Sequence, residues 1–243
     1  CAAKFSPARC DNTVYWLAIE QGGYSVRRLE GRTPRRVSTP EIGDILDDYG
    51  LTFFSDGISA AYGFSWNFGG HSFYALTLPS AALTLIYDVS TDTWQTRTSG
   101  GFAGWRVTHA EQAFRSLLMG DSTGRIGYLR RDVHQEYGSA IDWLTVCAPV
   151  DFERRMLTHT RLELEIDSKP KSTVRTVSMA FSDDEGQTWS PEFVATTGTY
   201  LKAPNSCVWT GLGSAISRLY RFKGSGNTPI GLIRAFVDVE VGG

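Results

Sequence analysis

Residues 182–189 read Ser-Asp-Asp-Glu-Gly-Gln-Thr-Trp and match the turn pattern S-x-D-x-G-x-T-W at every specified position. The side-chain oxygens of Ser182 and Asp184 are short acceptors that can hold backbone N–H groups within a tight turn. Gly186 permits a left-handed backbone, Thr188 completes the pattern, and Trp189 offers a large apolar surface to a neighbouring strand. This pattern, called an Asp box, closes hairpins in many β-propellers and β-sandwiches. It predicts a hairpin and is weak evidence for an enzyme.

A looser version of this design lies upstream. Gly69-Gly70 precedes the stretch Tyr-Asp-Val-Ser-Thr-Asp-Thr-Trp at positions 87–94, which resembles the turn of a kelch blade. The segments around Trp16 and at 117–129 also have an apolar strand, a turn rich in Gly, Asp, Ser or Thr, and a second apolar strand. This recurrence predicts propeller-like blades or a sandwich, with Trp94 and Trp189 as buried anchors.

The composition agrees with an all-β protein. The 243 residues include 25 glycines and 12% aromatic residues, which suit short strands joined by tight turns. Residues 161–167 and 216–222 alternate strictly between apolar and polar, as strands with one solvated face do. We expect a propeller-like β domain over residues 1–145 and a sandwich-like domain over residues 146–243. We also expect a fragment of a longer protein, so that the propeller is incomplete.

Shorter patterns predict individual elements. Residues 13–19 and 24–29 flank Gly22-Gly23 and predict a first hairpin, and residues 41–49 predict a short acidic helix. The segment 108–118 is compatible with a helix, but its place between Trp105 and a glycine-containing turn favours two strands. Further strands are expected at these positions: 58–66, 71–78 and 83–88.

The net charge of −2 gives no general argument for binding to nucleic acid or to a membrane. No apolar run approaches the roughly 20 residues that span a bilayer. The four cysteines lack C-x-x-C spacing, so they are interpreted as small apolar side chains that are buried in the core. The four histidines are too scattered along the sequence to predict a metal site. We therefore expect no metal, no cofactor and no catalytic residue.

Three catalytic hypotheses deserve comparison. A sialidase would need an arginine cluster and a tyrosine–carboxylate pair, and the chain has no R-I-P-type motif. Gly120-Asp121-Ser122 is similar to the nucleophile turn of GDS-type hydrolases, with Asp132 and His134 as partners, but the hairpin context and the D-x-H spacing favour a structural turn. The adjacent carboxylates at 47–48 and 183–184 point apart, so they predict solvated turn and helix-end residues.

Charge is distributed in two blocks. Residues 1–40 are net basic, and residues 41–60 carry five acidic residues and no basic one. Such blocks can be a solvated surface, complementary contacts between subunits or with an adaptor, or arginines that neutralise DNA phosphates without reading bases. The candidate interface residues are Arg27, Arg28, Arg35, Arg36, Asp44, Asp47 and Asp48.

The order of motifs over residues 10–241 resembles the C-terminal half of the packaged-DNA stabilisation proteins of short-tailed bacteriophages, which are tail accessory or head-closure factors. The matching stretches, in chain order, are Tyr15-Trp16-Leu17-Ala18, Tyr24-Ser25-Val26, Arg36-Val37-Ser38-Thr39-Pro40, the acidic helix, residues 71–79, Tyr87-Asp88, Trp94, Trp105-Arg106, residues 120–126, Tyr137-Gly138, Leu162-Glu163-Leu164-Glu165, the Asp box and residues 209–213.

The resemblance implies a structural virion protein that forms a ring on the tail axis and seals the DNA channel after packaging. It also implies a platform for tail assembly, with a hexamer expected for the full-length protein. Expected partners are the portal-side adaptor, the tail needle or tail fibres, and packaged DNA through non-specific contact. The expected location is the phage tail, after assembly in the bacterial cytoplasm. The alternative, favoured by the Asp box and the kelch-like turn alone, is a carbohydrate-binding or glycosidase-type β-propeller.

Overall fold

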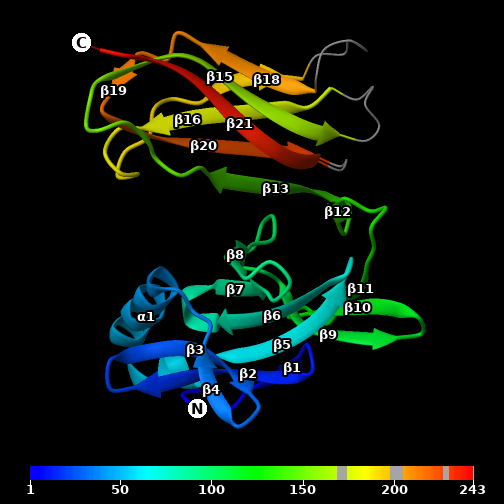
Figure 1. The fold of residues 1–243 in the computed structure, drawn as a ribbon. Helices are drawn as coiled ribbons and strands as arrows, with labels where there is room; N and C mark the ends of the chain where they lie inside the picture. The colour runs from blue at the N-terminus through cyan, green and yellow to red at the C-terminus, as the bar shows by residue number, and fades with distance from the viewer. Residues whose placement is uncertain (169–173, 198–204, 227–229, 243) are drawn as a thin grey trace. The chain divides into compact units, whose positions relative to one another are not determined.

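The structure, a computed structural model, describes residues 1–168, 174–197, 205–226 and 230–242, without the side chains of residues 51–56 and 168. Its elements are nearly all β-strands, so the predicted all-β class is confirmed (Figure 1). The chain divides into two compact units, unit 1 with residues 1–132 and unit 2 with residues 133–243. We expected the division between residues 145 and 146. It falls earlier because the strand Ser139–Val146 pairs with a strand of unit 2.

Unit 1 contains three antiparallel sheets in which each strand pairs with the next one along the chain, as in propeller blades. Blade 1 consists of β1 (Ala8–Cys10), β2 (Thr13–Glu20), β3 (Gly23–Glu30) and β4 (Thr33–Arg36). Blade 2 consists of β5 (Tyr62–Phe68), β6 (His71–Leu78), β7 (Leu83–Asp88) and β8 (Thr93–Arg97), with the short helix η1 (Pro79–Ala81) between β6 and β7. Blade 3 consists of β9 (Val107–Ala113), β10 (Ser116–Asp121) and β11 (Ile126–Leu129).

Aromatic side chains fill the spaces between neighbouring blades. The ring of Tyr15 in blade 1 stacks on Tyr74 of blade 2, with centroids 5.5 Å apart. Between blades 2 and 3, the ring of Trp105 lies 5.6 Å from Trp66, and Met119 is buried in the same cluster. Blade 2 therefore packs against both of its neighbours through two separate apolar clusters, one shared with blade 1 and one shared with blade 3.

The helix α1 (Pro40–Ser59) joins blade 1 to blade 2 and is longer than the predicted 41–49. The predicted range stops just before Gly50, but the helix continues through it, and a Cβ at Gly50 would lie 2.5 Å from the ring of Tyr24, so this glycine permits close packing. The buried face of α1 continues past it, from Leu46 and Tyr49 to Ile58. The strand predicted at 58–66 therefore begins later, at Tyr62.

The other predicted elements of unit 1 occur where expected. Strands β2 and β3 form the first hairpin, and β6 and β7 match the ranges 71–78 and 83–88. The segment 108–118 forms the two strands β9 and β10 and no helix. Short strands joined by tight turns explain these matches, because both signals are local in the sequence.

Unit 2 is a β-sandwich of two sheets. Its strands are β12 (Gln135–Glu136), β13 (Ser139–Val146), β14 (Val150–Asp151), β15 (Leu157–Ser168), β16 (Thr176–Ser182), β17 (Phe193–Thr196), β18 (Ser206–Thr210), β19 (Ser214–Ala215), β20 (Ser217–Gly226) and β21 (Ile230–Val241). One sheet has the order β12-β13-β20-β16-β17, with β14 beside β20. The other has β18, β19 and β21 paired with β15. The alternating residues of β15 and β20 bury Leu162, Leu164, Tyr220 and Phe222 between the sheets.

Candidate functional site

The Asp box forms the turn after β16, and its side chains hold the backbone of that turn. The Ser182 hydroxyl donates to Asp184 Oδ1 (2.7 Å) and accepts the N–H of Gly186 (2.9 Å). Asp184 Oδ1 in turn accepts the backbone N–H of Thr188 at 2.9 Å. Hydrogen bonds from the hydroxyl and the N–H of Thr188 and from Ser182 lower the pKa of Asp184 to about 2.

Trp189 closes the turn, since its indole N–H donates to the Gly186 carbonyl at 3.1 Å. The Arg221 guanidinium lies 4.3 Å from the centre of its ring. We expected Trp189 and Trp94 to be buried, but both are half-buried. Trp94 joins two blades instead, because its indole N–H donates to the carbonyl of Val37 at 3.0 Å.

Gly186 lies in the left-handed region with φ +90°. An added Cβ would meet only Leu219 and Trp189 at 3.7 Å, which is ordinary contact. We expect Gly186→Ala to lower the free energy of unfolding of unit 2 by more than about 1 kcal/mol, through backbone strain alone. Urea denaturation would measure this. Gly100→Ala is the control, since nothing lies within 4 Å of a Cβ there and its φ is not left-handed. Equal effects of the two changes would contradict the prediction.

The Asp box also anchors a buried polar network that the sequence did not reveal. Asp183 accepts two hydrogen bonds from Arg218, at 2.6 and 2.7 Å, although we expected a solvated turn residue. Arg218 is 2% exposed and also donates to the Leu212 carbonyl. Beside it, the hydroxyl of Tyr220 lies 2.8 Å from Nδ1 of the buried His159. A buried guanidinium needs such partners, because an unpaired charge is costly in a low-dielectric interior.

Burial and the nearby Arg218 charge lower the pKa of His159 below its ordinary value. Below about pH 6.5, His159 therefore binds a proton more readily in unfolded unit 2 than in folded unit 2. We expect the contribution of His159 to the free energy of unfolding of unit 2 to be complete above that pH and to fall as the pH decreases below it. His159→Gln should flatten this slope in denaturation curves between pH 5 and 7, and the exposed His109→Gln should leave it unchanged. An unchanged slope in His159→Gln would refute the role of this histidine.

Two turns of unit 1 repeat the use of an aspartate at a strand end. Asp88 Oδ1 accepts the N–H of Ser90 at 2.9 Å, and Asp121 Oδ1 accepts the N–H of Thr123 at 2.9 Å. Burial alone would raise the pKa of Asp121, but bonds from Thr123, from the Arg125 backbone and from Arg106 hold that pKa well below its usual range. The carboxylate that a GDS-type interpretation would place beside a nucleophile is thus held by the turn and by Arg106.

The four candidate arginines lie on the β3–β4 hairpin, where Arg27 pairs with Arg36 and Arg28 with Arg35 across the strands. Like charges directly opposite destabilise a sheet unless carboxylates offset them. Glu20 contacts Arg27, and Glu30 contacts both Arg28 and Arg35. Arg36 donates to the carbonyl of Ser38 at 3.1 Å. Three of the four arginines therefore have carboxylate partners within blade 1.

The three candidate aspartates lie on α1 and differ in their surroundings. Asp47 is half-buried and accepts the backbone N–H of Tyr24 at 2.6 Å, so it fastens the helix to β3. Asp44 and Asp48 are exposed, one turn apart on the same helix face. The structure brings all the candidate charges to blade 1 and its helix, but it gives Asp47 a structural contact.

Within the described ranges, no cluster of three or more His, Cys, Asp or Glu side chains has the arrangement of a metal site. The described helices include none long and apolar enough to span a bilayer. The four cysteines are free thiols. Cys10 and Cys207 are buried as expected, whereas Cys147 is half-buried and Cys1 is exposed.

The two units match two models of one protein family. Residues 1–134 match the family described as "Bacteriophage P22 Gp10, beta-propeller", and residues 142–240 match "Bacteriophage P22 Gp10, beta-sandwich". The chain belongs to the bacteriophage P22 Gp10 family. Membership supports a structural role in a phage and a place in the virion, and it favours a structural protein over an enzyme. The order of the two family models, propeller and then sandwich, is also the order of the two units in this Gp10-family chain.

A search of curated proteins gives no match for the chain. Among solved structures, one described as "Glycoside hydrolase" has 11% sequence identity over 94% of this chain and 68% of its own, with a TM-score of 0.24. A TM-score this low carries no argument about fold or activity.

Proposed function

We propose that this chain is part of a ring that seals the portal and tail channel, stabilises packaged DNA and serves as a platform for tail assembly. The observation that carries the proposal is the match of both units, in order, to the two Gp10 domains. The proposed partners are further copies of the protein, with a hexamer expected, the portal-side adaptor, and the tail needle or tail fibres. Assembly takes place in the bacterial cytoplasm before the protein joins the tail.

The fold supports such a role physically. A plug must resist the pressure of packaged DNA, and blades that are close-packed on one another through apolar clusters are stiff supports for a contact surface. Three of the carboxylates weighed as catalytic candidates have structural contacts: Asp183 binds Arg218, Asp184 holds its own turn, and Asp121 binds Arg106.

The candidate charges are proposed as contacts with other subunits or with the adaptor. Asp44 and Asp48 suit this role best, because they are exposed and no ion pair with them occurs in the described part of the chain. If the arginines instead face packaged DNA, their role is phosphate neutralisation without base reading.

The test uses phage in which the gene for this protein is disrupted. Packaged heads are expected to lose their DNA, and added full-length protein is expected to restore retention and tail attachment. Retention of DNA without the protein, with normal tails, would overturn the proposed function.

Charge variants separate the two roles. Asp44→Lys with Asp48→Lys is expected to weaken ring formation, most strongly at low ionic strength, because salt at about 0.1 M largely screens exposed charges that are more than about 10 Å apart. Asp142→Lys, an exposed change in unit 2, is the control. If Arg27→Gln or Arg36→Gln lowers DNA retention while rings assemble normally, the arginines contact DNA.

A further inference from the structure

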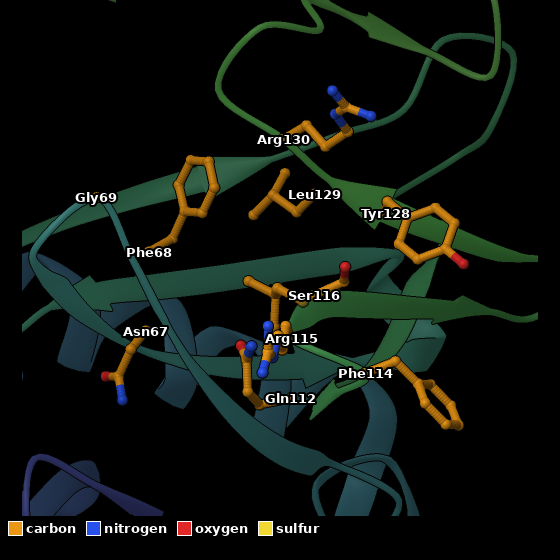
Figure 2. Close-up of a pocket in the computed structure, with 11 residues that line it drawn as sticks. Asn67, Phe68, Gly69, Gln112, Phe114, Arg115, Ser116, Tyr128, Leu129 and Arg130 are labelled. Atoms are coloured by element: carbon orange, nitrogen blue, oxygen red, sulfur yellow. The ribbon is translucent and has the colours of Figure 1, made fainter.

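A pocket of about 490 Å³ opens in unit 1 where blades 2 and 3 meet. It lies among the β5–β6 turn, the β9–β10 turn and the end of β11. Figure 2 shows Phe68 and Leu129 beside each other, with Arg115 beside Gln112 and Ser116. Its lining combines an apolar wall with polar and basic groups and contains no acidic residue.

The pocket carries positive charge that the chain does not neutralise. Among the described residues, no carboxylate contacts Arg115, and the guanidinium of Arg131 lies 5.9 Å from the ring of Phe68 without an acidic partner. Arg130 is paired with Asp132 at 2.7 Å. The unneutralised Arg115 in the lining, with Arg131 packed on the ring of the lining residue Phe68, makes this a site for an anionic group that also has an apolar part.

The β9–β10 turn is locally unfavourable. Phe114 and Arg115 both have left-handed backbones, at φ 52° and 59°, in a two-residue turn where Asn-Gly is preferred. Phe114 is also 92% exposed. The chain therefore accepts backbone strain beside an exposed aromatic ring at the edge of a basic pocket, and backbone strain of this kind clusters at functional sites.

A complementary surface lies on α1. Glu41, Asp44 and Asp48 are exposed at spacings of three and four residues, so they form one stripe along the helix. Ile45, beside this stripe, is 38% exposed. The stripe thus offers carboxylates next to an apolar side chain, the chemistry that the pocket accommodates.

Figure 1 places α1 and β9–β11 on opposite sides of unit 1. The arginines of β3 and β4 do not suit the stripe as well, since Glu20 and Glu30 already contact three of them. We propose that the Arg115 pocket receives the acidic stripe of α1 from a second copy of this chain. Two different surfaces on opposite sides give a head-to-tail contact, the kind that closes into a ring. This inference rests on the proposed ring function and names its contact.

The test is sedimentation velocity of the 243-residue chain at low and high ionic strength. The chain is expected to self-associate at low salt and less at high salt. Arg115→Glu, or Asp44→Lys with Asp48→Lys, should each weaken association at least about tenfold, and an equimolar mixture of the two variants should restore it. Arg155→Glu is the control, because it makes the same charge change at an exposed position of unit 2, outside both proposed surfaces, and should leave association unchanged.

A second variant distinguishes loss of the contact from loss of the fold. Phe114→Asn with Arg115→Gly gives the turn its preferred residues, so the melting temperature should rise by a few degrees while association weakens.

The contact is wrong if the wild-type chain stays monomeric at low salt up to about 1 mM, or if the mixed variants fail to associate. It is also wrong if Arg115→Glu reduces binding to a short DNA duplex without reducing self-association, since the pocket would then bind phosphate. Successful phage complementation alongside any of these results would leave the tail role intact and reject the contact alone.

Discussion

Tyr74→Ala is expected to lower the free energy of unfolding of unit 1 by about 4 kcal/mol, from the lost burial of a large ring and the cavity that remains. Tyr74 is 0% exposed and stacks on Tyr15, so it joins blade 2 to blade 1. Its hydroxyl donates to the Ser6 carbonyl at 2.9 Å, which also fastens the N-terminal segment.

Urea denaturation followed by tryptophan fluorescence would measure this loss. Tyr74→Phe keeps the ring and removes one hydrogen bond, so it should cost about 1 kcal/mol. Tyr128→Ala, at a ring that is 64% exposed, should stay within about 0.5 kcal/mol of the wild type. A loss in Tyr74→Ala no larger than in Tyr74→Phe would show that this ring does not hold the blades together.

Asp183→Ala is expected to lower the free energy of unfolding of unit 2 by about 3 kcal/mol. The change leaves the guanidinium of Arg218, which is 2% exposed, without its carboxylate partner. An uncompensated buried charge costs about 3–5 kcal/mol, and we expect the lower end because the Asp183 side chain is itself 43% exposed and water can partly replace it.

The double variant Asp183→Ala with Arg218→Met distinguishes this cause from simple damage to the turn. Removing the charge together with its partner should recover most of the lost stability, since an apolar side chain can pack against Phe181, whose ring the guanidinium covers at 4.0 Å. Asp142→Ala, at an exposed position, is the control. If the double variant is as unstable as Asp183→Ala alone, the hairpin and not the ion pair is responsible.

The Tyr74 prediction bears on the proposed function. The Tyr74 cluster fixes α1 and blade 1 against blade 2, and blade 2 packs on blade 3. The acidic stripe and the Arg115 pocket are therefore both carried by this set of packed blades. A variant that loosens the packing between the blades should weaken head-to-tail association even though it changes no charged residue.

Local sequence signals determined most of the elements. The Asp box predicted the hairpin after β16 because its bonds run between residues no more than four apart. Alternation predicted β15 and β20, and a glycine-containing turn placed β9 and β10 correctly. The family resemblance, which depended on motif order along the chain, is confirmed by both family matches.

Tertiary structure decided what depends on residues far apart. The helix predicted over 41–49 extends to Ser59, and it passes through Gly50 where the ring of Tyr24 packs against the helix. Asp183 was predicted to be a solvated turn residue. Its partner in the ion pair, the buried Arg218, lies 35 residues later in the chain. The basic block looked like the available positive surface, yet Glu20 and Glu30 neutralise much of it, while Arg115 has no such partner. Sequence gives the charge of each residue, but folding chooses its neighbours, and the neighbours decide which charges remain free to bind a partner.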